Sequence, residues 1–489
     1  MVDRRHVRLG TLGLMITLVA GCSASGGTGR SAPAVGNAGR PYVESPGPVA
    51  EANPAERPTS TFGMDVDTAS FGYARRTLRD GRRPDPATVR PEEFVNALRQ
   101  EYRDPAGDGF TVQADGAELP ESHRSPGGNA DRIMRIGLQT RHDTAGRRPD
   151  AALTFVVDVS GSMGEPGKLD LVKDALRTLI EQLRPTDSVA IVAYDDTART
   201  LREMTSVHEM RSLVDAVDGL RVGGSTNLEA GLVRGYEVAR AGFRPGASNR
   251  VVLLSDGLAN VGDTTAAPIL SRVREAAAKQ IALLGVGVGS DYGDALMEQL
   301  ADKGDGFVVY VSEPEQARKV FVDRLPATLA VRALDAKVQV TFDPAAVRSY
   351  RLIGYDDRGL NASDFRDDRV DGGEVGPGHS VTALYAVRLK PDATGRVAEA
   401  RVRWLDPTSR EASEQAAAVM VEDLARGFAA ATPRLRLDYA AAYFAESLRD
   451  SAYGREVRLA DLAGIAGTIG DDPEAADLAS LIRTADRLR

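Results

Sequence analysis

Nearly continuous apolar runs alternate with amphipathic stretches over residues 150–325. The apolar runs predict strands buried on both faces, and the stretches between them have the spacing of helices. Strands that alternate with helices favour an α/β fold with a mostly parallel sheet covered on both faces. The strands are expected at Ala151–Val159, Ser188–Tyr194, Arg250–Ser255, Ile281–Val288 and Phe307–Val311, with a short edge strand near Arg199–Met204. The helices are expected at Leu169–Leu183, Met210–Leu220, Leu228–Ala241, Ala266–Lys279, Asp294–Lys303 and Glu315–Leu325.

The regions before and after this block follow a different pattern. Half-buried strands are expected near Thr61–Ser70 and at Arg132–Thr140, helices at Phe71–Arg79 and Pro91–Tyr102, and a polar connection at 103–130. Further strands are expected at Lys337–Phe342, Val381–Leu389 and Ala398–Trp404. A helical pattern is expected from Ser413 to Arg489, with Ala-rich faces around Ala416–Ala430, Leu437–Leu448 and Glu474–Leu488. Each side offers few strands, and a two-stranded unit is marginally stable. We therefore hypothesise that residues 60–140 and 332–410 pack into one β-rich domain, with the α/β block inserted between them.

Residues 1–22 have the pattern of a bacterial lipoprotein signal. A basic start precedes an apolar run, Leu9–Ala20, that is too short to span a bilayer as a mature helix but suits a signal peptide. Val19-Ala20-Gly21-Cys22 resembles the lipobox, and lipidation explains why the only cysteine of a secreted chain, Cys22, is unpaired. We expect a chain attached by lipid to the extracytoplasmic side of a membrane of the cell envelope. The sequence does not decide between the inner and the outer membrane.

Composition and charge narrow the range of possible functions further. Residues 22–58 are rich in Gly, Ser, Ala and Pro, which is typical of a flexible tether. The net charge of −9 argues against a nucleic-acid-binding protein. Removal of residues 1–21 takes away three Arg and one Asp, so the mature chain is still more acidic. Such a chain should not bind anionic lipid by charge, and acyl chains would have to supply the membrane affinity.

Three oxygen-bearing side chains, Asp158, Ser160 and Ser162, stand at every second position after the first strand of the block. Hard oxygen donors on such a loop suit Mg²⁺ or Mn²⁺ better than zinc. In parallel sheets, ligands bind beyond the carboxyl ends of strands where the strand order reverses, and Asp256 follows another strand in the same way. The spacing alone is weak evidence, and a polar turn that caps the next helix explains it equally well.

The signatures of conventional enzymes are incomplete. Gly167-Lys168 resembles the end of a P-loop, but Ser162 stands where the first glycine belongs and Leu169 where Ser or Thr should bind Mg²⁺. Gly285–Ser290 lacks the third glycine of a dinucleotide fingerprint, and no Gly-x-Ser-x-Gly nucleophile elbow surrounds the serines of this loop. We therefore expect no enzymatic activity.

Two further loops complete an oxygen-ligand site. Gly223–Asn227 lies just before a helix, and Ser255-Asp256-Gly257 follows a later strand. Together with Asp158-x-Ser160-x-Ser162, these loops closely resemble the metal-ion-dependent adhesion site of von Willebrand factor type A (VWA) domains. That pattern is Asp-x-Ser-x-Ser, then Thr, then Asp. The resemblance covers residues 150–325 and implies a Rossmann-like domain, with a central, mostly parallel sheet and helices on both faces.

The resemblance also implies a role for each ligand. Ser160 and Ser162 would contact the ion directly, Thr226 would do so when a ligand is bound, and Asp158 and Asp256 would act directly or through waters. Ser225 stands beside Thr226, so the ligand from this loop could be either of these two neighbouring residues. Mostly neutral ligands leave the ion an open coordination position, which an acidic side chain of a partner protein can fill.

The flanks resemble those of a group of bacterial lipoproteins. Ser60–Ser70 resembles the N-terminal domain that precedes VWA in that group, and Tyr350–Tyr355 and Val381–Tyr385 resemble its C-terminal domain of unknown function. The expected organisation is a lipoprotein signal peptide at 1–21, a tether at 22–58, an N-terminal VWA-associated domain at 59–147, the VWA domain at 148–328 and a C-terminal domain of strands and then helices at 329–489.

The function predicted from these features is that of an extracytoplasmic, lipid-anchored binding or scaffold protein. It would recognise a protein partner through a Mg²⁺ ion held by Asp158, Ser160, Ser162, Thr226 and Asp256. Two alternatives stay open. One is a structural envelope lipoprotein whose metal only stiffens the loops, and the other is a Mg²⁺-dependent hydrolase, which would need a general base that the sequence does not show.

Overall fold

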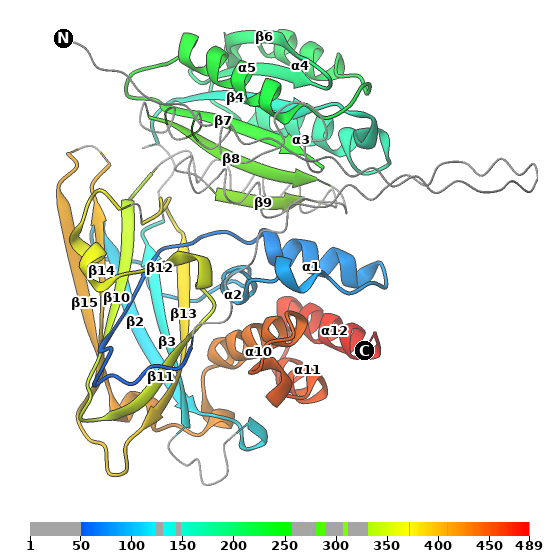
Figure 1. Cartoon of the computed structure of the whole chain (residues 1–489). Helices are drawn as coiled ribbons and strands as arrows, with labels where there is room; N and C mark the ends of the chain where they lie inside the picture. Colours follow the sequence, from blue (N-terminus) through cyan, green and yellow to red (C-terminus); the bar gives the residue numbers. More distant parts are fainter. Residues whose placement is uncertain are drawn as a thin grey trace, which may run out of the picture. The chain divides into compact units, whose positions relative to one another are not determined.

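The fold contains three β-sheets and several helices in the part of the chain that the structure describes (Figure 1). The computed structural model describes residues 50–123, 131–142, 148–256, 271, 273, 275, 280–288, 307–311, 331–370, 372–407 and 409–488. Short 3₁₀ turns occur at Pro86–Thr88, Glu121–His123, Gly161–Gly164, Val207–Glu209, Asp356–Arg358, Ala362–Arg366, Val421–Leu424, Phe428–Ala430 and Gly454–Glu456.

The α/β block forms a six-stranded sheet in the order β6-β5-β4-β7-β8-β9. The strands are β4 (Ala151–Asp158), β5 (Ser188–Tyr194), β6 (Ala198–Ser206), β7 (Ser248–Ser255), β8 (Ile281–Val288) and β9 (Phe307–Val311). All neighbouring pairs are parallel except that of β5 with the edge strand β6. Every residue of β4 and of β5 is buried, as expected for strands with helices on both faces.

Side chains of β4 alternate between two hydrophobic cores. Leu153, Phe155 and Val157 share one core with helices α3 (Leu169–Gln182) and α4 (Met210–Asp218), whereas Val156 shares the other with α5 (Leu228–Ala241). This alternation confirms the expected Rossmann-like arrangement. Of the expected helix Ala266–Lys279, the structure describes only residues 271, 273 and 275, which are helical, and the helices expected at Asp294–Lys303 and Glu315–Leu325 lie outside the described residues.

Two antiparallel sheets combine strands from both sides of the α/β block. One has the order β11-β13-β3-β2, and the other has the order β12-β1-β10-β14-β15. Strand β3 pairs with β13, and β1 pairs with β10 and β12, so that strands before residue 142 are paired with strands after residue 331. The strands are β1 (Thr59–Gly63), β2 (Phe110–Glu118), β3 (Asp131–Thr140), β10 (Leu334–Phe342), β11 (Val347–Ile353), β12 (Gly359–Leu360), β13 (Ser380–Leu389), β14 (Arg396–Leu405) and β15 (Ala412–Met420).

This pairing confirms the hypothesis that the two flanks form one β-rich body. Residues from both sheets share one hydrophobic core, including Phe62, Ile136, Val338 and Tyr385. We call the β-rich part formed by residues 50–142 and 331–424 the β body.

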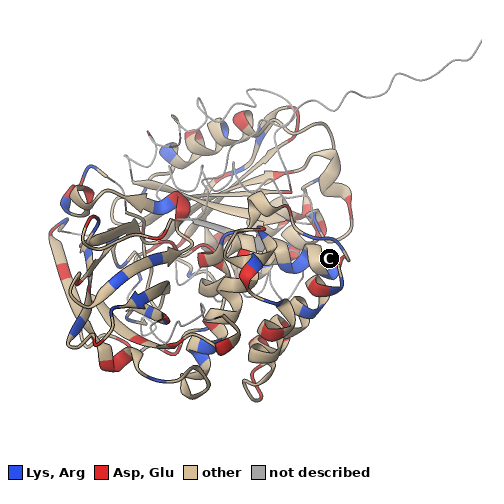
Figure 2. Cartoon of the chain, turned by 60° about the horizontal axis from the view of Figure 1, so that its bottom comes forward, with Lys and Arg blue, Asp and Glu red and all other residues tan. Residues whose placement is uncertain are grey.

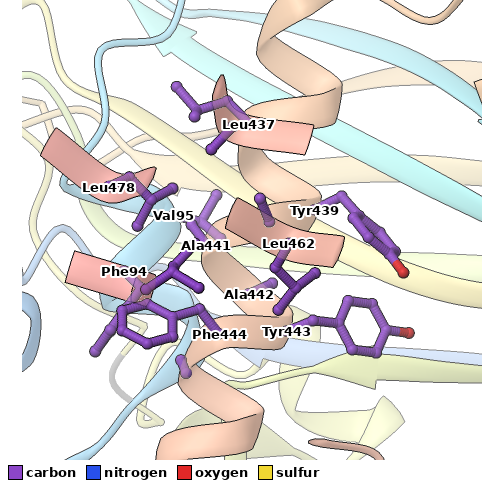
Figure 3. Packing of buried hydrophobic residues seen from close by; sticks show 14 of the residues in the cluster. Phe94, Val95, Leu437, Tyr439, Ala441, Ala442, Tyr443, Phe444, Leu462 and Leu478 are labelled. Atoms are coloured by element: carbon purple, nitrogen blue, oxygen red, sulfur yellow. The ribbon is translucent and has the colours of Figure 1, made fainter. Parts of the chain in front are cut away.

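Five helices build the remaining core of the flanks. They are α1 (Ala69–Arg79), α2 (Pro91–Asn96), α10 (Pro433–Leu448), α11 (Leu459–Gly467) and α12 (Pro473–Arg487). The central helix α10 is buried along almost its whole length, and its Ala441, Ala442 and Phe444 lie among Phe94 of α2, Leu462 of α11 and Leu478 of α12 (Figure 3). A helix that is buried all round needs partners on every side, and these helices supply them.

Several expectations for the flanks are wrong. The helix expected around Ala416–Ala430 is instead the strand β15 followed by short turns, because β15 pairs with β14 along its length. The connection expected at 103–130 contains β2, and α2 ends at Asn96 rather than at Tyr102. Strand β11 was not expected, whereas α11 lies within residues 413–489, where a helical pattern was expected.

Two general observations concern the surface and the helices. Lys and Arg are interspersed with Asp and Glu over the elements drawn in Figure 2, so neither sign of charge dominates them. Among the described residues, no helix is long and apolar enough to cross a membrane.

Candidate metal centre

The candidate site lies at the carboxyl end of β4. The chain passes from β4 to β5 on one side and later to β7 on the other, so the strand order reverses at β4. Parallel pairing aligns the ends of these strands, with Asp158 opposite Tyr194 and Val157 opposite Leu254. Loops that leave neighbouring parallel strands at such a switch point meet at the same edge of the sheet.

Asp158 is fully buried and is held from two sides. Its Oδ1 accepts a hydrogen bond from the Ser160 N–H at 2.8 Å, and its Oδ2 accepts from the Ser255 hydroxyl at 2.7 Å and the Tyr194 hydroxyl at 3.3 Å. Burial raises the pKa of the Asp158 carboxyl above its ordinary value, and hydrogen bonds from Ser160 and Ser255 offset part of this rise. The carboxylate is therefore fixed in orientation and held where a cation would stabilise its charge.

The serines connect Asp158 to Asp256. Ser160 Oγ lies 3.2 Å from Ser162 Oγ, and the Ser162 hydroxyl donates to Asp256 Oδ1 at 2.9 Å. Ser160 and Asp256 are buried, whereas Ser162 is exposed. The structure thus brings four of the five predicted ligands into one hydrogen-bonded series that opens to solvent at Ser162.

The loop that carries Thr226 lies against the loop after β4. The Gly223 N–H donates to the Val159 carbonyl at 2.8 Å, and the Gly161 N–H donates to the Gly224 carbonyl at 3.0 Å. Gly224 has a φ of +68°, and a Cβ there would lie 2.7 Å from Asp196 Oδ2, so this close approach requires glycine.

Within this loop, Thr226 is buried, and the neighbouring Ser225 donates its N–H to Asp196 Oδ1 at 2.9 Å. Asn227 caps helix α5 by accepting the Ala230 N–H at 3.0 Å, which fixes where the loop ends. The loop is thereby anchored on both sides of Thr226.

Lys168 is a member of the site that sequence reasoning missed. Its Nζ lies 2.8 Å from Asp256 Oδ2 and 2.8 Å from Glu165 Oε2, and its side chain is 4% exposed. Burial alone would lower the pKa of Lys168, but hydrogen bonds to Asp256 and Glu165 outweigh burial and raise it. In the sequence, this lysine fits only the end of an incomplete P-loop pattern, and no local signal connects it to Asp256.

The donors fit a hard divalent cation. The five predicted ligands offer two carboxylates and three hydroxyls, without sulfur or imidazole, which suits Mg²⁺ or Mn²⁺. Among the described residues, no group of three or more His, Cys, Asp or Glu could hold a metal ion, so hydroxyl ligands would have to complete this site. The Asp256 carboxylate already has the ammonium group of Lys168 beside it, at 2.8 Å.

Comparisons with known proteins identify the family to which each part of the chain is similar. Residues 152–323 match the von Willebrand factor type A domain, residues 327–488 match the C-terminal domain of Uncharacterized protein YfbK, and residues 48–125 match a family described as von Willebrand factor. Uncharacterized protein YfbK of Escherichia coli (strain K12) is 31% identical over 458 residues, which cover 88% of this chain and 79% of that protein.

Other proteins are similar to this chain over a shorter stretch or at a lower sequence identity. Inter-alpha-trypsin inhibitor heavy chain H1 of Mesocricetus auratus is 30% identical over 173 residues, covering 34% of this chain and 19% of that protein. Among solved structures, a von Willebrand factor type A protein from Catenulispora acidiphila matches with a TM-score of 0.49 and 17% identity, over 80% of this chain and 97% of that chain.

The fold and the family matches define the class: the chain is a VWA-domain protein. It belongs to the family of Escherichia coli YfbK, with which it shares the VWA domain and the C-terminal domain. VWA domains generally mediate protein–protein interactions, and proteins that carry them are generally not enzymes.

Proposed function

We propose that this chain is a lipid-anchored binding or scaffold protein of the cell envelope that recognises a protein partner through a Mg²⁺ ion. Asp158, Ser160, Ser162, Thr226 and Asp256 would hold the ion, and Mn²⁺ would be an acceptable substitute. The observation that supports this proposal most strongly is the hydrogen-bonded series from Asp158 through the two serines to Asp256. This series brings together oxygen donors from the loops that follow β4 and β7.

The surrounding residues would keep these donors in position. Bound Mg²⁺ would supply a positive centre with an open coordination position for an acidic side chain of the partner. Ser255 and Tyr194 hold Asp158 Oδ2, so the carboxylate does not need to reorient when an ion arrives. Ser162 is exposed, which supports access to the site from solvent.

The proposed location follows from the N-terminal sequence. Cys22 would carry the lipid, and residues 22–58 would tether the folded part to the membrane on its extracytoplasmic side. The partner would then be a protein of the envelope or one that reaches it.

The first experiment measures the ion itself by titration calorimetry of the full chain with Mg²⁺. Ser162→Ala removes a ligand at an exposed position, and we expect it to weaken Mg²⁺ binding by about tenfold or more. Ser413→Ala, which changes an exposed serine of the β body, is the matched control and should leave the affinity unchanged. Equal Mg²⁺ affinity in the wild type and in Ser162→Ala would contradict the assigned ligands.

The second part of this test concerns the partner. The full chain, extracted in detergent, is used to capture partners from envelope fractions in Mg²⁺ or in EDTA. The proposal expects a specific partner that is retained in Mg²⁺ and lost both in EDTA and with Ser162→Ala. Capture that survives both EDTA and Asp158→Ala would favour the structural alternative, in which the metal only stiffens the loops.

A further inference from the structure

We propose that Lys168 is a built-in cation of the metal centre, which neutralises Asp256 in the ion-free protein and competes with a divalent ion for that carboxylate. This inference rests on the proposed function, because it concerns the regulation of the same site. The Lys168 ammonium group lies 2.8 Å from Asp256 Oδ2 on one side and 2.8 Å from Glu165 Oε2 on the other. Lys168 and Asp256 are almost fully buried, whereas Glu165 is exposed.

The turn before α3 fixes the position of Lys168. The Lys168 N–H donates to the Glu165 carbonyl at 3.3 Å, and the Gly167 N–H donates to Asp170 Oδ1 at 3.0 Å. Gly167 has a φ of +84°, a conformation that favours glycine. This turn brings Lys168 to the N-terminal end of α3 and directs its ammonium group towards Asp256.

The helix itself does not explain a lysine at this position. Lys168 is the N-cap residue of α3, and its side chain makes no capping hydrogen bond. The positive end of the helix dipole lies there, which disfavours a nearby cation. The carboxylates of Asp256 and Glu165 therefore supply the stabilisation that holds this buried ammonium group.

Without a metal ion, Lys168 would prevent a costly unpaired charge. Asp256 is 2% exposed, and its other oxygen accepts a hydrogen bond from the neutral Ser162 hydroxyl. A buried carboxylate whose partner cation has been removed is strongly destabilising. Lys168 would thus keep the ligand loops assembled before an ion binds.

With a divalent ion bound, the same ammonium group would oppose it. An ion that contacts Asp256 directly or through a water would lie close to Lys168, and like charges repel strongly where water is partly excluded. Lys168 would therefore weaken ion binding and make it reversible. It would also add positive charge beside the open coordination position, which favours a carboxylate of the partner over a neutral group.

The test compares Lys168→Met with the wild type in the full chain, because Met retains most of the side-chain volume without the charge. Titration calorimetry should show Mg²⁺ binding at least about tenfold tighter than in the wild type, on the scale of a removed charge contact. The unfolding midpoint of Lys168→Met should be lower than that of the wild type in EDTA, and its rise on adding Mg²⁺ should be larger. Lys173→Met on the same helix, whose Nζ donates to the carbonyls of Asp218 and Leu220, should leave the Mg²⁺ affinity and the rise of the midpoint on adding Mg²⁺ as in the wild type.

Glu165→Gln gives a second measurement in case Lys168→Met does not fold. Without the Glu165 carboxylate, the Lys168 charge would act fully on Asp256 and on the ion, so Mg²⁺ should bind several-fold more weakly. Folding of Lys168→Met in Mg²⁺ but not in EDTA would support the proposal.

Failure of this inference is distinguishable from failure of the proposed function. If the wild type binds Mg²⁺ and Lys168→Met binds it equally or more weakly, competition by Lys168 is overturned and the metal site stands. If the wild type binds no Mg²⁺, both proposals are overturned. Unchanged stability of Lys168→Met in EDTA would overturn the neutralising role of Lys168.

Discussion

Glu92, on the first turn of α2, has a buried carboxyl group whose Oε2 has no hydrogen-bond partner. Burial and the nearby carboxylates of Asp356 and Asp65 raise its pKa from an ordinary value of 4.5 to about 7. Gly354 packs against it so closely that an added Cβ would lie 2.3 Å from Oε2. This carboxyl group is therefore a source of pH dependence within the flanks, separate from the metal centre.

The first prediction concerns the stability of the chain as this group titrates. Because the pKa is raised on folding, the stabilisation is fully present below about pH 4.5 and is lost as the pH rises through about 7. The shift corresponds to at most about 3–4 kcal/mol. Glu92→Gln should remove this loss, which urea unfolding at about pH 5 and about pH 7.5 measures. The exposed Glu422→Gln should keep the wild-type pH dependence, and an identical dependence in Glu92→Gln would contradict the assignment.

At the candidate metal centre, some residues could be predicted from the sequence and one could not. Asp158, Ser160, Ser162 and Asp256 were identified because their spacing after apolar strands has a recognisable pattern, and the structure brings them together. Lys168 could not be identified in this way. Its contact with Asp256 joins residues 88 positions apart, and that contact depends on the fold bringing the start of α3 to the end of β7 rather than on any local pattern.

At the scale of elements, periodicity predicted the α/β block well and the flanks less well. The strands β5, β8 and β9 and the helix α5 have the expected bounds, because continuous apolar runs and a clear helical face define them. Strand β15 was predicted as a helix because its Ala-rich sequence has high helix propensity. Its pairing with β14 overrides that propensity, and single-sequence periodicity does not report such pairing.

The second prediction tests whether α12 packs as an integral part of the core of the flanks. Ala479 is buried in that core, whereas Ala476, three residues earlier on the same helix, is exposed. Ala479→Leu should lower the free energy of unfolding by about 1–3 kcal/mol because the added side chain overfills the core. Ala476→Leu should change it by less than about 0.5 kcal/mol. Equal effects of the two substitutions in chemical unfolding would show that α12 does not pack in this way.

At the scale of the whole molecule, the β body consists of two segments separated by the VWA domain. Neither segment supplies a complete sheet, since β3 lies between β2 and β13, and β1 lies between β10 and β12. The hypothesis of one shared domain followed from counting strands on each side of the block. The order of the strands within each sheet could not be predicted, because it depends on contacts between distant parts of the chain.

The ends of the β body on either side of the VWA domain lie close together. The Arg141 carbonyl accepts a hydrogen bond from the Gly378 N–H at 3.0 Å, and the Arg332 N–H donates to the Val375 carbonyl at 2.8 Å. Because Val375 and Gly378 are three positions apart, their Cα atoms are separated by at most about 11 Å. A short linker can therefore span the gap between residues 142 and 331.

The third prediction follows from this geometry. Replacing residues 143–330 by a Gly/Ser linker of about eight residues should leave the β body and its helices folded, because every strand of both sheets is retained. Circular dichroism and thermal unfolding should show a cooperative transition, and Mg²⁺ should not shift its midpoint because the metal centre has been removed. Residues 50–142 expressed alone, which lack the partners of β1 and one partner of β3, should not fold cooperatively. A linked chain that is as unfolded as this fragment would show that the flanks need the VWA domain for their own stability, and that the insertion is part of the folding unit.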